Sequence, residues 1–160
     1  MVDKPDMQMI SFDNKKKCEV MAVLVRDCAG GVVFCADKVF LLKNEKGEWV
    51  LPKGRIRGDM LPADTALQRV KIEGGIDAEI VIQVGETRYE FFSVTRRQPV
   101  FNKINWFAMR ALDEAYQVNA ELQYADGGYF AVPEAIELAT YSQDKGLISV
   151  AYRKYQEIMA

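Results

Sequence analysis

Apolar runs of strand length recur along the chain, and turn residues separate them. The clearest hairpin has runs at 38–43 and 49–51 on either side of the turn Asn-Glu-Lys-Gly at 44–47. Glycines 30 and 31 inside the first run predict a bend or bulge in that strand. The strands that we expect lie at 18–34, 38–43, 49–51, 79–84, 87–94, 105–111 and 127–132.

The segment 62–74 follows a helical period instead. Its apolar residues are spaced three and four apart, which places them on one stripe of a helix. Pro62 suits the first helical turn, and Gly74-Gly75 suits the end. The stripe consists of Ala63, Ala66, Leu67 and Val70, and we expect the last three to be buried.

The C-terminal part of the chain is also predicted to be helical. A short helix is expected at 133–139, and Ser142 is a candidate N-cap for a final helix that runs to about residue 158. The apolar side of the final helix consists of Leu147, Val150, Ala151, Tyr155 and Ile158. This order of elements predicts one mixed α/β (α+β) domain in which helices cover a mixed sheet.

Length and composition are those of one soluble globular domain, with 160 residues, 49% hydrophobic and 28% charged. The net charge of -2 predicts no general attraction to nucleic acid or membrane, so an anion site must be a local cluster of Lys and Arg. The polar residues 1–17 are expected to form a loose N-terminal arm before a domain at 18–160. No apolar segment has the length of a signal peptide or membrane span, so a cytoplasmic location is the default expectation.

The chain contains no histidine. Its absence excludes Ser-His-Asp and Cys-His catalysis and histidine-based metal sites. The three cysteines, Cys18, Cys28 and Cys35, match no zinc spacing and are expected to behave as small buried apolar residues.

One stretch, from Leu51-Pro52-Lys53-Gly54 to the end of the expected helix, resembles the Nudix box. The family pattern is Gly, five residues, Glu, seven residues, then Arg-Glu-apolar-any-Glu-Glu-any-Gly-apolar. The positions that fall on this spacing are Gly54, Val70, Glu73, Gly75 and Ile76. The similarity extends over roughly residues 20 to 158 and is nearest to the diadenosine polyphosphate hydrolases. It implies a Nudix-like α/β/α sandwich, a nucleotide-like small-molecule partner, and Mg²⁺ as the cofactor of an active member.

Most carboxylates of the box are missing. The isolated Glu of the family is Met60 here, its Arg is Gln68, the next Glu is Arg69, and the first Glu of the final pair is Ile72. Positions 69, 72 and 73 share one helix face, where three carboxylates would hold Mg²⁺ and position a water against a diphosphate. Only Glu73 remains as a candidate catalytic residue and metal ligand, so we expect weak Mg²⁺ binding, of millimolar or poorer affinity.

Two hypotheses concern Arg69. It could replace the charge of the metal and bind a phosphate chain together with Lys53, Arg55 and Arg57, because guanidinium groups bind phosphate directly. Alternatively, it pairs with Glu73 at i+4 as an ordinary surface ion pair.

Other carboxylates could replace the missing ligands. Asp59 adjoins the missing Glu, and Glu86 and Glu90 lie in later segments from which the family sometimes draws a ligand, as do Glu114 and Glu121. Each is more often a solvated surface charge.

Aromatic residues could supply a face on which a nucleobase stacks, although such residues in a sheet are more often core. The candidates are Tyr89, Trp106 and Tyr129, with Phe91 beside the first. Arg96-Arg97 with Lys103 could be a phosphate-facing loop or a solvated hairpin tip.

Two functions of different class therefore stand. The favoured one is a Nudix-fold domain that binds a nucleoside or dinucleoside polyphosphate, with its hydrolase activity weak or lost. The alternative is an active Mg²⁺-dependent pyrophosphohydrolase that cleaves phosphoanhydride bonds in substrates such as diadenosine polyphosphates. A homodimer is left open.

Overall fold

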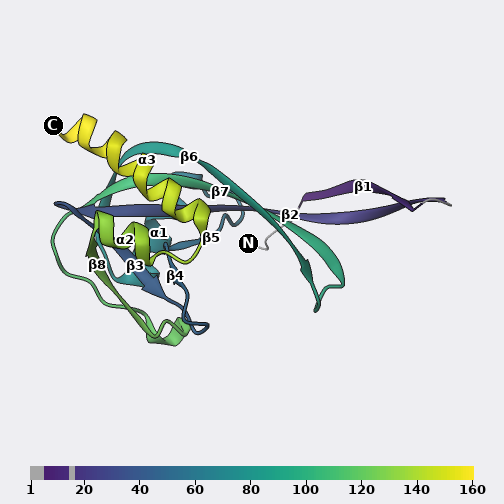
Figure 1. The fold of residues 1–160 in the computed structure, drawn as a ribbon, viewed down its shortest axis with the longest axis horizontal. Helices are drawn as coiled ribbons and strands as arrows, with labels where there is room; N and C mark the ends of the chain where they lie inside the picture. Colours follow the sequence, from purple (N-terminus) through teal and green to yellow (C-terminus); the bar gives the residue numbers. More distant parts are fainter. Residues whose placement is uncertain (1–5, 15–16) are drawn as a thin grey trace.

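The computed structural model describes residues 6–14 and 17–160, and their side chains from residue 22 onward. A mixed sheet lies between helix α1 on one face and helices α2 and α3 on the other (Figure 1). The strands are β1 (Asp6–Asn14), β2 (Lys17–Cys35), β3 (Lys38–Lys43), β4 (Trp49–Val50), β5 (Lys53–Arg55), β6 (Ala78–Ser93), β7 (Gln98–Ala111) and β8 (Asp126–Ala131). The helices are α1 (Pro62–Gly74), α2 (Val132–Leu138), α3 (Ser142–Met159) and the 3-10 helix η1 (Ala120–Leu122). The layered α/β architecture expected from the sequence is confirmed.

Strand β2 organises the sheet. On one edge it pairs in parallel with β7 over residues 24–34. Its other edge pairs antiparallel with β1, β5 and β3 in succession. Strand β6 pairs with β7, while β4 and β8 pair with β3. Strand β2 thus lies between β5, which belongs to the box loop, and β7, which carries later site candidates.

Each face of the sheet carries its own core. Beneath α1, Ala66 and Val70 pack with Phe40 and Met109. On the opposite face, α3 buries an apolar stripe against residues that include Phe34 and Trp106. Because side chains alternate between the two faces of a strand, membership of these cores shows which face each β2 and β7 residue occupies.

The glycines at 30 and 31 do not produce the expected bend. The register of β2 with β7 runs through both without a shift. A Cβ at Gly30 would lie 2.5 Å from Trp106 Cζ3, and one at Gly31 would lie 2.7 Å from Val70 Cγ2. The glycines are therefore required by close packing on the two faces and not by backbone conformation.

Helix α1 matches its predicted bounds, with Ala66 and Val70 buried, but Leu67 is only half-buried. The two strands expected at 79–94 are one bulged strand, β6, and β7 begins at Gln98, earlier than predicted. Long antiparallel pairing supplies backbone hydrogen bonds that continue through polar residues, so the apolar pattern underestimated both strands.

The predictions for α3 need two corrections. Tyr141, not Ser142, occupies the N-cap position, and no side chain caps it. Val150 and Ile158 are exposed, whereas Ile148 is buried in their place. The first three turns of α3 therefore bury a stripe that includes Leu147, Ile148 and Ala151.

The N-terminal segment differs from the expected arm. Residues 6–14 form β1, which pairs with the start of β2 and extends away from the helices (Figure 1). Residues 1–5 and 15–16 lie outside the described residues, and a domain boundary near residue 17 stays a prediction. Cys28 is buried as expected and Cys35 is half-buried, while the side chain of Cys18 lies outside the described residues. Across the described chain, none of the helices has the length and apolar character needed to cross a membrane.

We predict that Gly31→Ala lowers the free energy of unfolding by about 1–3 kcal/mol, because the added Cβ overpacks the contact with Val70. Urea denaturation measures the change. The matched control is Gly146→Ala within α3, where a Cβ meets no atom within 4 Å. This substitution should raise stability by about 0.5–1 kcal/mol, as alanine is the better helix former. Equal effects of the two substitutions would contradict the close-packing explanation.

Candidate functional site

The box residues are held by backbone contacts to β2. Pro52 O accepts a hydrogen bond from Gly31 N at 3.1 Å, and Ile56 N donates to Asp27 O at 2.9 Å. Between these two anchors, Lys53–Arg55 form β5. The chain then turns at Gly58-Asp59 and enters α1 at Pro62. The loop and the helix of the box are therefore fixed relative to each other.

Glu73, the one carboxylate that the box retains, lies in the last turn of α1 and is 0% exposed. Arg69 Nε donates to its Oε2 at 2.7 Å, and Tyr124 Oη donates to its Oε1 at 2.6 Å. Both carboxylate oxygens are thus engaged inside the protein. The pairing of Arg69 with Glu73 at i+4 was one of our two hypotheses, but Glu73 is buried and Arg69 half-buried, so this is not an ordinary surface pair.

Tyr124 belongs to a segment that closes over the end of α1. Within this segment, Gln117 N donates to Gly74 O at 2.8 Å and Asn119 N donates to Glu73 O at 3.0 Å. The Asn119 side chain also donates to Ile72 O at 3.0 Å. Sequence analysis missed Tyr124, because nothing in its neighbourhood marks a partner 51 residues earlier in the chain.

Arg69 also fills the space between α1 and the box loop. A Cβ at Gly54 would lie 2.5 Å from both Cδ and Nε of Arg69. The side chain of Arg69 is 27% exposed, so most of it is covered. The glycine of the box therefore provides room for an arginine in this chain.

Burial raises the pKa of Glu73, while the hydrogen bond from Tyr124 and the charge of Arg69 act in the opposite direction. Burial also raises the pKa of Tyr124, and the Glu73 carboxylate raises it further. Tyr124 therefore remains protonated and can donate. With two internal donors and 0% exposure, the Glu73 carboxylate has no oxygen accessible to solvent, from which a metal or a water could bind.

The other candidate metal ligands do not complete a site. Asp59 and Glu90 are exposed. Glu86 is paired with Arg88 at 3.2 Å and with Lys103 at 3.9 Å. Across the described residues, no group of three or more Asp, Glu or Cys side chains is placed to hold a metal ion. Since Mg²⁺ requires several oxygen ligands in octahedral geometry, the side chains present do not suit it.

The predicted phosphate-binding cations lie on two different faces. Gly54 faces α1 and Arg69, whereas its neighbours Lys53 and Arg55 alternate to the opposite face of β5. The pairing of Arg55 with Cys28, a member of the α3-side core, agrees with this placement. Arg57 is exposed beyond the end of the strand. The side chain of Lys53 leaves β5 on the face opposite Arg69, yet its charge still reaches Glu73, where it adds to the lowering of the pKa by Tyr124 and Arg69.

A basic cluster forms on the α3 face instead, consisting of Arg26, Lys53, Arg55 and Arg96. Burial lowers the pKa of Arg26, and the charges of Arg55 and Arg96 lower it further. Burial raises the pKa of Cys28, and the charges of Lys53, Arg55 and Arg26 oppose this. Like charges held this close repel one another, and an anion bound among them would relieve the repulsion.

Several acidic side chains lie near the basic cluster. Hydrogen bonds from Tyr141 and Asn44 lower the pKa of Glu48, and the charge of Lys53 lowers it further. Burial raises the pKa of Asp144, in the first turn of α3, and the charge of Lys53 lowers it. Asp27 alternates to the opposite face of β2 and is exposed. The four basic residues therefore gather on one side of the sheet with carboxylates beside them. Sequence analysis missed Arg26 and gave Arg96 a separate loop role, because only the fold brings Arg55 and the hairpin tip near Arg26.

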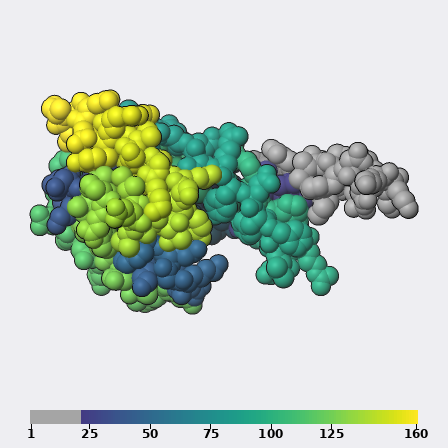
Figure 2. All heavy atoms as spheres, in the orientation of Figure 1, coloured from purple at the N-terminus to yellow at the C-terminus, as the bar shows by residue number. Residues whose placement is uncertain are grey.

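The β6–β7 hairpin borders this cluster. It stands out from the body of the molecule, in teal, and meets the start of α3 (Figure 2). At that meeting point Gln143 Nε2 donates to Arg88 O at 3.0 Å. Arg96 and Arg97 form the hairpin tip, whereas Lys103 lies within β7 on the other face. The basic cluster thus lies in the angle between the hairpin and α3.

The three aromatic candidates have different surroundings. Trp106 is 1% exposed and its Nε1 donates to Thr87 Oγ1 at 2.8 Å, so its ring is core and does not offer a face to a ligand. Tyr89 is 40% exposed on the hairpin and stacks with Phe91 at a centroid distance of 6.1 Å. Only Tyr89 combines an exposed ring with proximity to the basic cluster.

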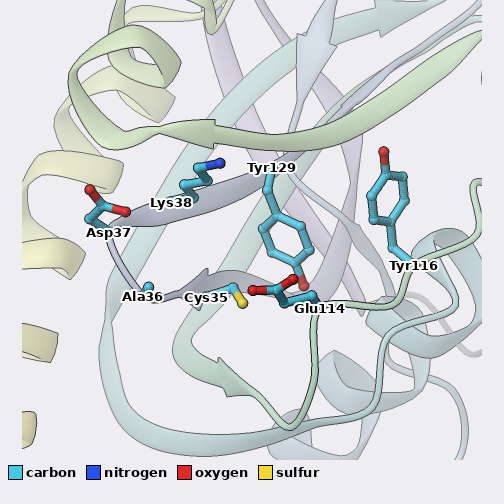
Figure 3. Close-up of a pocket in the computed structure, with 7 residues that line it drawn as sticks. All are labelled: Cys35, Ala36, Asp37, Lys38, Glu114, Tyr116 and Tyr129. Carbon is cyan, nitrogen blue, oxygen red and sulfur yellow. The ribbon is translucent and has the colours of Figure 1, made fainter.

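Tyr129 lines a separate hollow of about 310 Å³ at the turn between β2 and β3 (Figure 3). Two carboxylates, Asp37 and Glu114, and one ammonium group, Lys38, also line it. This balance of charge does not favour a polyphosphate, so a stacking role for Tyr129 stays a prediction without support from the charges around it.

We predict that Arg69→Leu lowers the free energy of unfolding at pH 7 by about 3–5 kcal/mol, because it leaves a buried carboxylate without its cation. Without Arg69, the pKa of Glu73 in the folded state rises further above its unfolded value. Stability should then be highest below the ordinary glutamate pKa and fall as the pH rises through the folded pKa. Urea denaturation between pH 4 and pH 8 measures this dependence.

The control is the double variant Arg69→Leu/Glu73→Leu, which removes both charges. It should recover most of the stability lost in the single variant and show little of its pH dependence. If the single variant costs under 1 kcal/mol at every pH, the pair behaves as a surface pair and our description of it is wrong.

Comparison with known proteins agrees with the fold and the box. A family model for the NUDIX domain matches residues 16–148. Similar structures include a C. elegans Ap4A hydrolase binary complex, with 16% identity, a TM-score of 0.62 and coverage of 82% of this chain and 98% of that one. The NUDIX domain of Shewanella oneidensis NrtR, complexed with ADP ribose, has 16% identity, a TM-score of 0.65 and coverage of 81% and 88%. An E. coli dihydroneopterin triphosphate pyrophosphohydrolase has 17% identity, a TM-score of 0.63, and coverage of 76% of this chain and 91% of that one.

These identities are low, so the structural likeness shows the fold alone. The family model, in contrast, spans most of the chain. The protein belongs to the Nudix family.

Proposed function

We propose that this Nudix domain binds a nucleoside or dinucleoside polyphosphate through its basic cluster and hydrolyses it weakly or not at all. The observation that carries the proposal is the closure of Glu73 by Arg69 and Tyr124. A carboxylate that is 0% exposed offers no accessible oxygen to a metal ion held against a diphosphate while Arg69 and Tyr124 stay in place.

The loss of hydrolysis follows from the side chains that replace the family's ligands. Where the family has carboxylates, this chain has half-buried Met60, Arg69 and exposed Ile72. None of these can coordinate Mg²⁺ or accept a proton from water near neutral pH. The favourable electrostatics of metal-assisted cleavage are therefore missing at the box.

Retention of ligand binding is supported by the basic cluster. Guanidinium and ammonium groups bind phosphate oxygens without a metal, through charge-assisted hydrogen bonds. The cluster includes two box residues, Lys53 and Arg55, and lies next to the exposed ring of Tyr89. A Nudix relative of this fold is complexed with ADP ribose, which is the class of ligand that such a site would take.

We predict that ATP and diadenosine tetraphosphate bind equally well in EDTA and in Mg²⁺, since the contacts require no metal. Isothermal titration calorimetry gives the affinities, and release of products measures turnover. Lys53→Gln should weaken binding by more than tenfold. The matched control, Lys71→Gln, removes an exposed lysine of α1 that pairs with Asp77, and should have little effect.

Brisk turnover with Mg²⁺ that stops in EDTA would contradict the proposal and establish the alternative, an active pyrophosphohydrolase. The ligands would then have to come from carboxylates at positions other than those of the family pattern, with Asp59, Glu86 and Glu90 examined first.

A second prediction concerns the metal site itself. The triple variant Met60→Glu/Arg69→Glu/Ile72→Glu should gain Mg²⁺ affinity, because it restores the carboxylates on one helix face. It should be destabilised without metal by repulsion around Glu73, and Mg²⁺ should raise its melting temperature by binding the folded state. The wild-type melting temperature should not change with millimolar Mg²⁺. A clear Mg²⁺-dependent rise in the wild type would show that a metal site survives.

A further inference from the structure

The hollow at the turn between β2 and β3 lies apart from the basic cluster. Cys35 at the hollow and Arg26 in the cluster are nine residues apart on β2, which is about 30 Å at the rise of a strand. The volume of the hollow, about 310 Å³, is at the small end of the range for ligand pockets. Most residues that line it are exposed, so a small ligand can reach it from solvent.

Two tyrosine rings form a corner in this hollow (Figure 3). Tyr116 and Tyr129 lie at a centroid distance of 5.8 Å, with their planes 80° apart. Both rings also contact the buried ring of Phe40, at centroid distances of 5.6 Å and 5.4 Å. A Cβ at Gly128 would lie 3.3 Å from Tyr116 Oη, so the glycine gives this side chain room. Tyr116 is therefore held by its neighbours although it is 46% exposed.

Carboxylates outnumber ammonium groups around the corner. Asp37 and Glu114 line the hollow together with one ammonium group, that of Lys38. Neither carboxylate forms an ion pair with another residue in the part of the chain that the structure describes. Burial raises the pKa of Tyr129, and the charge of the nearby Asp113 raises it further. The tyrosine is therefore neutral, and the charge around it is predominantly negative.

Aromatic rings beside carboxylates suit one class of ligand. The face of a ring carries negative charge density that attracts a cation within about 6 Å of the ring centre, and nearby carboxylates add Coulomb attraction. A divalent metal ion would need several ligands in contact with it, but no group of three or more Asp, Glu or Cys side chains is placed to hold one among the described residues. An alkylammonium ion needs no such shell of ligands, and its carbon groups can pack against the rings.

We infer that this hollow binds a small alkylammonium ion. Tyr116 and Tyr129 would contact its methyl or methylene groups, while Asp37 and Glu114 would balance its charge. The hollow shares no residue with the basic cluster, so the inference does not depend on the proposed function. The domain would then recognise an anion and a cation at two separate sites.

The test compares two probes, choline and 3,3-dimethyl-1-butanol, which has the shape of choline with carbon in place of the charged nitrogen. Each is titrated into the full chain, and the backbone amide signals are followed by NMR. We expect choline at millimolar concentration to cause saturable shifts in the signals of residues that line the hollow. The alcohol should bind about tenfold more weakly or worse, because it lacks the charge that the rings and carboxylates attract. Equal concentrations of sodium chloride control for ionic strength.

Variants of the aromatic corner test the ring itself. Tyr116→Leu should weaken choline binding about fivefold, because leucine keeps an apolar side chain but has no aromatic face. Tyr116→Phe keeps the ring and should bind choline within about twofold of the wild type.

A variant of the rim tests the charge. Glu114→Gln changes an exposed side chain and should weaken choline binding about threefold, because it removes one attracting charge. Its matched control is Glu121→Gln, which changes an exposed glutamate of η1 outside the hollow and should leave choline binding unchanged.

Three results would overturn the inference. Equal binding of choline and the alcohol would show that the hollow selects apolar shape and not charge. Absence of saturable shifts around the hollow would show that it holds no alkylammonium ion. Equal weakening by Glu114→Gln and Glu121→Gln would reduce the effect to general attraction by acidic surface. Binding of ATP in EDTA is measured separately, so either proposal can fail while the other stands.

Discussion

The burial of Glu73 is the constraint around which the box region is built. A carboxylate enclosed by protein costs free energy unless it is paired and hydrogen-bonded, and here it meets one cation and one hydroxyl group. The cation, Arg69, also covers Gly54 of the loop, and the hydroxyl group comes from Tyr124 of the segment before β8. A position that serves metal binding in the family pattern thus joins three parts of the chain and stabilises their arrangement.

The alternation of side chains along β2, β5 and β7 determines which charges can cooperate. It places Arg69 and Glu73 on the α1 face, and Arg26, Lys53 and Arg55 on the α3 face. Three of these cations lie within a short stretch of sequence, at 53, 55 and 69. Nearness in sequence suggested one phosphate site. Strand alternation instead places Arg55 and Arg69 on different faces, the charge of Lys53 acts on Glu73 as well, and Arg26 and Arg96 join Arg55 from distant segments.

The sequence predicted local structure better than it predicted partners. The bounds of α1 and β3 follow from apolar periodicity and turn residues, which act within a few positions. The extra length of β7, the role of the paired glycines and the contact of Tyr124 depend on elements far along the chain, so no local pattern encodes them. For the same reason the expected stacking role of Trp106 gave way to burial. The sequence shows that residue 106 is aromatic, but it does not show that its ring faces the core.

Because the two faces are separate, a change that weakens metal-assisted hydrolysis at α1 need not affect phosphate binding at the basic cluster. Carboxylates on α1 act only if substrate phosphates reach that helix, whereas the basic cluster is built from strands β2 and β5 and the β6–β7 hairpin. Replacing carboxylates at 60, 69 and 72 leaves the backbone register of those strands unchanged, because it depends on the sheet and not on the metal. With Arg69 in the space beside Gly54, a carboxylate restored at position 60 or 72 alone would add little affinity for Mg²⁺, since Arg69 and Tyr124 would still enclose Glu73. The basic cluster on the α3 face is free of that constraint, because its residues belong to strands and to the hairpin and not to α1.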